Sequence, residues 1–341
     1  MKELMRNNNS QRIDYIDFLK FLGLTGIIIA HVGSPRWAIM LRNFDVPLMV
    51  ILSSLLGAEA YQRCKISKVS SFEYFVRRIK RLVIPAWVFL FFYFAVHVLL
   101  LQKVFSFKYY ISSFLLTRYG IGYVWVILVY LYSALAIPFW AEISFSKKSV
   151  FCLLLTYIIY EIAYYLHIGT TNKFIITTFY YIIPYGGLLT YLGYNYNRMD
   201  KRKYIVLGLS IVIFLISGLY YLQHYGALQN VQLAKYPPRC YYLSYGIAVS
   251  FALLIICEKV KFAFYKNPII KFIAANSMWI YLWHIAVLVV YKTLRLPKAW
   301  VIKFLIVYFV SIVIVYIINS LLDLIEEKKG KKINFFKFLR G

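Results

Sequence analysis

The stretch YIVLGLSIVIFLISGLYYL, residues 204–222, contains no charged side chain and is long enough to cross a bilayer as a helix. Of the 341 residues in the chain, 62% are hydrophobic and 15% are charged, whereas soluble domains have roughly half apolar and about a quarter charged residues. This composition excludes a soluble globule and a disordered chain. The sequence therefore predicts an integral membrane protein.

Charge clusters and Pro or Gly breaks divide the chain into ten apolar stretches of this kind. They predict an all-α polytopic protein with a single membrane domain over residues 1–341 and no additional soluble domain. Pro184, Gly186 and Gly187 interrupt the sixth stretch. The predicted spans are 13–34, 43–61, 82–102, 122–140, 149–168, 174–193, 204–222, 239–257, 268–291 and 300–323.

The few charges are mostly positive, with 39 Lys and Arg against 13 Asp and Glu and a net charge of +26. Short cytoplasmic loops of membrane proteins carry an excess of Lys and Arg. Most of the basic residues fall on the cytoplasmic side if the N-terminus is inside, so we expect an N-in, C-in topology. The charge therefore reflects membrane topology rather than nucleic-acid binding.

The sequence has no pattern that predicts a metal site or a disulfide framework. Its four cysteines are scattered and include no C-x-x-C pair. His, Asp and Glu form no ligand motif such as H-E-x-x-H. We therefore expect no metal.

Ionisable residues within a span are costly and mark candidate functional sites. Lys20 and His31 are eleven residues apart, which returns a helix to within about 20° of the same face, at an axial separation of about 16 Å. Asp17 is within pairing reach of Lys20. The alternative interpretations are that Lys20 extends its amine to the membrane surface and that His31 is a neutral packing residue.

Arg78 and Arg81 lie in the segment FVRRIKRLVIPAW, just before the third predicted span, and are spaced to point the same way from a helix start. Arginine matches phosphate oxygens with two hydrogen bonds. The two residues are candidates for binding an anionic donor at the cytoplasmic surface. The alternative is ordinary positive-inside topology or contact with anionic lipids.

Three further residues are candidates for lining a pocket. His284 falls at a depth similar to that of His31, and Trp125 lies near the outer end of the fourth span. Trp125 is able to stack on a sugar ring, although an interfacial anchor is the more common role. Glu161 lies in mid-span, where a polar packing contact is the alternative. The similar depth of His31 and His284 near Trp125 predicts a pocket that opens outward, with the basic entrance on the inner side at Arg78 and Arg81.

The first span, RIDYIDFLKFLGLTGIIIAH, resembles that of the acyltransferase-3 family of bacterial membrane O-acyltransferases. The family motif is Arg or Lys, ten residues, then His, and Lys20 and His31 match it, with Asp17 at the preceding acidic position. The family usually has Arg followed by Gly, where this chain has Lys20 followed by Phe21.

Three later segments resemble the same family in the same order. RRIKRLVIPAW is similar to its R-x-x-R motif followed by Pro, and YVWVILVYLY to the Trp-containing start of its fourth span. NSMWIYLWH is similar to its Ser-x-x-x-Tyr-Leu-x-His segment, which adds Tyr281 to the candidate pocket residues. The resemblance covers the whole hydrophobic chain.

This resemblance implies a multi-pass protein of the bacterial inner membrane that transfers an acyl group, most often acetyl. The implied donor is acetyl-CoA or another acyl-CoA, and the implied acceptor is a hydroxyl of a surface glycan or lipid-linked saccharide. His31 would be the general base, or less readily an acyl carrier. Arg78, Arg81 and Lys20 would hold the donor, with Asp17 orienting Lys20.

A transporter or flippase for a glycan or lipid-linked sugar is the main alternative, because ten spans with a few buried charges also suit alternating access. The sequence shows no inverted repeat, and its buried charges concentrate in one span. A structural or sensory membrane protein is a third possibility. The shared face of Asp17, Lys20 and His31 argues against it.

Overall fold

The computed structural model describes residues 14–99, 101–143, 146–260, 262–333 and 335–340. Their regular secondary structure is helical, apart from an isolated bridge between Lys235 and Pro238. Residue 13 of the first predicted span and residue 100 of the third lie outside the described residues, as do the basic residues of segment 1–12.

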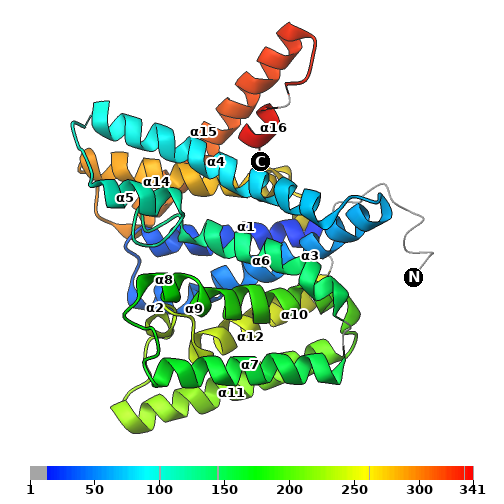
Figure 1. Cartoon of the computed structure of the whole chain (residues 1–341). Helices are drawn as coiled ribbons and strands as arrows, with labels where there is room; N and C mark the ends of the chain where they lie inside the picture. The colour runs from blue at the N-terminus through cyan, green and yellow to red at the C-terminus, as the bar shows by residue number, and fades with distance from the viewer. Residues whose placement is uncertain (1–13, 100, 144–145, 261, 334, 341) are drawn as a thin grey trace.

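The helices follow one another along the chain as Figure 1 shows. The longer ones are α1 (Asp14–His31), α3 (Asp45–Ile66), α4 (Ser71–Leu99), α6 (Trp125–Glu142), α7 (Lys147–Tyr165), α11 (Arg202–Tyr225), α12 (Cys240–Lys259), α14 (Ser277–Thr293) and α15 (Trp300–Lys329). The shorter ones are α2 (Arg36–Leu41), η1 (Arg42–Phe44), α5 (Phe107–Phe114), α8 (Lys173–Thr177), α9 (Phe179–Tyr181), η2 (Ile182–Leu189), α10 (Thr190–Asn195), η3 (Tyr196–Arg198), η4 (Val231–Ala234), η5 (Ala263–Lys266), α13 (Pro268–Ala275) and α16 (Phe336–Leu339).

Within the described residues, eight helical segments are long and apolar enough to cross a membrane, and the bent pair α13 and α14 makes a ninth. Each of the nine overlaps one of the second to tenth predicted spans. α1 occupies the first predicted span, but its 18 residues include the three charged side chains Asp14, Asp17 and Lys20, and it is not among these nine segments. The all-helical membrane fold is thus confirmed, while the count of ten and the N-in, C-in orientation stay predictions.

The ninth predicted span, 268–291, is wrong as a single helix. α13 ends at Ala275 and α14 begins at Ser277, and the two axes differ by 80°. Asn276 lies at the break, where its Nδ2 donates to the Phe272 carbonyl and its Oδ1 accepts from Asn319 of α15, both at 2.8 Å. Asparagine side chains compete with backbone hydrogen bonds in this way, and here the contact with α15 also fixes the bend.

The predicted interruption of the sixth span is confirmed. Residues 182–189 form wider, π-helical turns around Pro184, which lacks a backbone N–H. The Gly186 carbonyl accepts a hydrogen bond from the Trp140 indole at 2.9 Å. This segment therefore bends while remaining packed against α6.

The centre of the bundle contains α1, α3, α6 and α12, while α11 lies at its edge (Figure 1). About 61% of the apolar window around α3 and 67% of that of α12 are buried, against 11% for α11. Small residues bring α1 close to α3, because a Cβ on Gly26 would lie only 3.1 Å from the Cβ of Asp45. The end of α1 that carries His31 is thereby held in the interior.

Candidate active site

The predicted catalytic residues lie along one helix, α1. Asp17 is buried in its first turns, Lys20 is half-buried one turn later, and His31 is its last residue. The helix is continuous between Lys20 and His31, so their axial separation is about 16 Å. At the far end of α1 from His31, Asp14 pairs with Lys271 of α13 at 2.7 Å.

His31 and His284 come together although they are far apart in the sequence. Nδ1 of His31 lies 2.8 Å from Nε2 of His284, and the two rings stack at 5.0 Å with an angle of 9° between their planes. His284 is fully buried and His31 is half-buried. The predicted similar depth of the two histidines therefore corresponds to a direct hydrogen bond.

Hydrogen bonds to the backbone assign the protons of this pair. Nδ1 of His284 contacts the carbonyl oxygen of Tyr281, which only accepts, so this nitrogen is the donor. In neutral His284, Nε2 then carries the lone pair and accepts from Nδ1–H of His31. Neutral His31 consequently keeps its own lone pair on Nε2, which is the form a general base requires.

Tyr281 and Tyr123 support the histidine pair. The Tyr281 hydroxyl donates to the Tyr123 carbonyl, just before α6 begins. The Tyr123 ring packs edge-on against His31, with centroids 4.7 Å apart. Tyr281 therefore ties α14 to the start of α6 and orients His284. Nothing in the sequence marks Tyr123 among the 33 tyrosines.

A buried ion cluster lies beside this end of α1 and was not identified from the sequence. Arg42 Nη1 bonds Asp45 Oδ2 at 2.7 Å, and Lys235 Nζ lies 3.6 Å from Asp45 Oδ1. All three side chains are buried, and Arg42 also donates to Gln232 Oε1 at 2.8 Å. The positive charges of Arg42 and Lys235 act on His31. The i, i+3 spacing of Arg42 and Asp45 beside an apolar run is the signal that could have found them.

Lys235 belongs to the loop between α11 and α12 and is enclosed by aromatic rings. Its amine lies 5.9 Å from the ring of Trp125, 5.8 Å from Tyr236 and 5.6 Å from Tyr242. Burial lowers the pKa of Lys235 to about 8, although Asp45 acts in the opposite direction. The lysine therefore changes charge within an accessible pH range.

Trp125 is buried within this region, where its ring packs against other aromatic side chains of the protein. Its ring is 5.3 Å from Tyr236 and 5.6 Å from Tyr181. The tryptophan thus forms part of an aromatic cluster around Lys235, on the side of the bundle where α6 begins. This location is compatible with the predicted pocket role.

Glu161 has a different set of contacts. Its Oε1 accepts from the Cys240 backbone N–H at 2.6 Å and from the Tyr157 hydroxyl at 2.8 Å. It therefore caps the N-terminus of α12 from the neighbouring helix α7, where a carboxylate is favourable. The structure supports the alternative of a polar packing contact.

Arg78 and Arg81 lie one turn apart near the start of α4, away from the histidine pair. Arg78 is half-buried and lies over the Tyr74 ring at 5.2 Å, whereas Arg81 is exposed. Arg77 beside them pairs with Glu73 at 2.5 Å. The predicted i, i+3 arrangement is confirmed, and the binding role stays a prediction.

Comparison with curated proteins finds no match, and neither does comparison with solved structures. The family described as an acyltransferase domain, acyltransferase family 3, matches residues 13–320. The match extends from the residue before α1 into α15 and includes the histidine pair. The chain therefore belongs to the acyltransferase-3 family of membrane acyltransferases.

Proposed function

We propose that this acyltransferase moves an acyl group, most simply acetyl, from acyl-CoA to a hydroxyl of a surface glycan or lipid-linked saccharide. His31 is the general base. The observation that carries the proposal is the hydrogen bond between His31 and His284, because it leaves Nε2 of His31 ready to accept a proton. The setting is the inner membrane of a bacterium, as the family resemblance implies.

The reaction needs a single base and a positive environment. Nε2 of His31 takes the proton of the acceptor hydroxyl, and the oxygen attacks the thioester carbonyl carbon. The C–S bond then breaks, and the leaving thiolate takes the proton from His31, so an ester and a free thiol result. We assign Arg42 and Lys235 to stabilise the oxyanion that forms, because both act as positive charges on His31.

The donor is expected to approach from the other end of the bundle. In the predicted orientation Arg78 and Arg81 lie at the cytoplasmic surface and are free to contact the phosphates of CoA. The thioester arm then has to cover a distance similar to the axial rise of about 16 Å from Lys20 to His31. Lys20, oriented by Asp17, is assigned to guide this arm.

The test replaces His31 with Ala and measures acylated surface glycan by mass spectrometry, with membrane abundance measured in parallel. General base catalysis contributes about 10²- to 10⁴-fold, so product is expected to fall by at least about a hundredfold. His224→Ala is the matched control, because His224 is exposed and its ring contacts only its own helix and the Tyr220 ring next to it. Unchanged product in His31→Ala at normal abundance rejects His31 as the base.

A further inference from the structure

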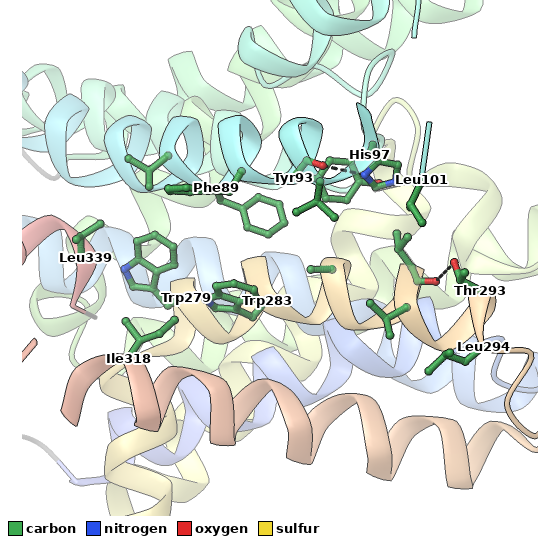
Figure 2. A pocket seen from close by; sticks show the side chains of 16 residues that line it. Phe89, Tyr93, His97, Leu101, Trp279, Trp283, Thr293, Leu294, Ile318 and Leu339 are labelled. Carbon is green, nitrogen blue, oxygen red and sulfur yellow. Dashed lines mark hydrogen bonds between the residues drawn. The ribbon is translucent and has the colours of Figure 1, made fainter. Parts of the chain in front are cut away.

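A cavity of about 570 Å³ lies between α4, α14 and α15, with α16 at one end (Figure 2). It is on the side of α14 that faces away from the histidine pair. Trp283 lines the cavity, whereas its neighbour His284 bonds His31. The cavity is therefore separated from the catalytic pair by a single helix.

The cavity wall is almost entirely apolar. Its lining includes the aromatic and aliphatic side chains of Phe89, Phe92, Trp279, Trp283, Ala286 and Val290.

Two polar groups of this wall are bonded to the backbone, and the buried indole N–H groups of Trp279 and Trp283 have no hydrogen-bond partner among the described residues. His97 Nδ1 contacts the Tyr93 carbonyl at 2.8 Å, and the Thr293 hydroxyl donates to the Val289 carbonyl. Water gains few partners in such a space, and an empty cavity of this size forfeits many packing contacts. This almost entirely apolar surface suits a hydrocarbon.

The shape of the cavity indicates a long chain. On α14 its lining runs from Trp279 to Thr293, which is about 21 Å along the helix axis. This covers most of the hydrocarbon core of about 30 Å. Figure 2 shows Leu339, Ile318 and Trp279 at one end and Leu101, Thr293 and Leu294 at the other. A chain lying parallel to the lipid tails fits these dimensions.

Basic residues lie close in the sequence to the lining residues at the second end of the cavity, which we call the mouth. Lys103 follows Leu101 closely, while Lys292 and Arg295 flank Thr293 and Leu294, and all three basic side chains are exposed. The segments 101–123 and 291–300 contain no Asp or Glu. These cations lie at the end of the bundle predicted to face outward, where positive-inside topology does not explain them. Their charge suits a phosphate group.

The mouth is electrostatically linked to the histidine pair. Lys292 contributes positive charge at His31, together with Arg42 and Lys235. On α14, Lys292 lies eight residues beyond His284, which is about 12 Å along the helix axis from the residue that bonds His31. A hydrocarbon tail in the cavity and a phosphate at the mouth together leave the remainder of a ligand free to extend toward His31.

We propose that this cavity and its basic mouth bind the lipid carrier of the acceptor, a long hydrocarbon chain bearing a phosphate to which the saccharide is attached. Resting on the proposed function, this inference assigns the acceptor class as a lipid-linked saccharide. The tail lies between α4 and α14, the phosphate contacts Lys103, Lys292 and Arg295, and the saccharide extends to His31.

The test uses the full chain in nanodiscs and a polyprenyl phosphate that carries a diazirine in its tail. We expect crosslinks in the cavity-lining parts of α4 and α14. Ala286→Trp fills the cavity and is expected to lower crosslinking at least about tenfold. The matched control is Leu305→Trp on the exposed face of α15. Equal crosslinking in these two variants contradicts the proposal.

A double variant at the mouth avoids any folding defect in the interior. Lys292→Ala combined with Arg295→Ala is expected to weaken binding of polyprenyl phosphate about tenfold and to leave binding of the uncharged polyprenol unchanged. If both probes weaken equally, or if phosphatidylglycerol with the same label competes equally, the cavity holds ordinary membrane lipid and the proposal fails.

Binding of the probe is measured independently of acyl transfer. His31→Ala is expected to bind the probe as the parent chain does, because His31 does not line the cavity. Loss of product with normal probe binding in His31→Ala supports both proposals. Normal product in His31→Ala rejects His31 as the general base. Absence of probe binding in the parent chain rejects only the lipid carrier site.

Discussion

At the scale of single residues, the central feature is the chain of hydrogen bonds from the Tyr281 carbonyl through His284 to His31. These hydrogen bonds select one tautomer of His31, with the proton on Nδ1 and the lone pair on Nε2. When His31 takes a proton on Nε2, His284 continues to accept from Nδ1–H and stabilises the cation. His284 is thus a positioning residue for the base.

Replacing His284 separates this role from simple packing. His284→Ala is expected to lower kcat by about a hundredfold or more. The variant removes the acceptor that holds the proton of His31 on Nδ1, and in enzymes with a histidine base the wrong tautomer of that base greatly slows catalysis. His284→Gln retains an acceptor oxygen and is expected to recover part of the loss. The measurement is kcat alongside acyl-CoA affinity. Equal activity of the Ala and Gln variants indicates that His284 only fills space.

Lys235 predicts a pH dependence of stability. Its folded pKa of about 8 is below the usual value of about 10.5, so the unfolded chain binds more protons between these values. Stability is therefore expected to rise as pH increases from about 8 to 10.5, by up to about 3 kcal/mol.

The comparison for this prediction is Lys235→Met. The thermal unfolding midpoint of the parent chain is expected to rise relative to that of the variant over this pH range. Parallel curves for the two chains show that Lys235 is charged throughout and contradict the assignment.

At the scale of helices, the features predicted correctly from the sequence are those that depend on neighbouring residues. Apolar length located the spans, and Pro184 with its glycines located the irregular sixth span, because these signals are contained in neighbouring residues. The break at Asn276 was missed, since an Asn within an apolar run is common and the decisive contact comes from Asn319. The long-range partner is not encoded in the local pattern.

Close helix packing gives a prediction at this scale. Gly193 of α10 lies against the backbone of α3, where an added Cβ would clash with the Ile51 carbonyl oxygen and Ser54 Cβ. Gly193→Ala is therefore expected to destabilise the protein by about 1–3 kcal/mol. Gly208→Ala on α11 is the matched control, because that position has open space and a helical Gly costs up to about 1 kcal/mol against Ala. Similar thermal midpoints for the two variants disprove the close contact.

At the scale of the whole molecule, the histidine pair and the Arg78 and Arg81 pair lie at different depths of one bundle. The family motifs identified most of these residues from the sequence, because each motif is local. The cluster of Arg42, Asp45 and Lys235 was not identified, since Lys235 comes from a loop far along the chain. The local motifs therefore located the histidine pair and the two arginines but not the buried charges of Arg42, Asp45 and Lys235.

The two arginines make a prediction at this scale. Arg78→Ala with Arg81→Ala is expected to weaken acyl-CoA binding by at least about tenfold, since charge-assisted hydrogen bonds to phosphate are lost. Lys147→Ala with Lys148→Ala removes the same charge from another predicted cytoplasmic segment and is expected to leave the affinity unchanged. Equal effects of the two double variants indicate that Arg78 and Arg81 contribute only to membrane topology.

The most direct measurement of the central claim uses proteoliposomes with labelled acetyl-CoA supplied only on the side of Arg78 and Arg81. The glycan acceptor is supplied on the side toward which His31 lies. We predict that the parent chain transfers label to the acceptor across the membrane and that His31→Ala does not. Transfer by His31→Ala at the parent rate, or transfer that requires both substrates on one side, contradicts the account.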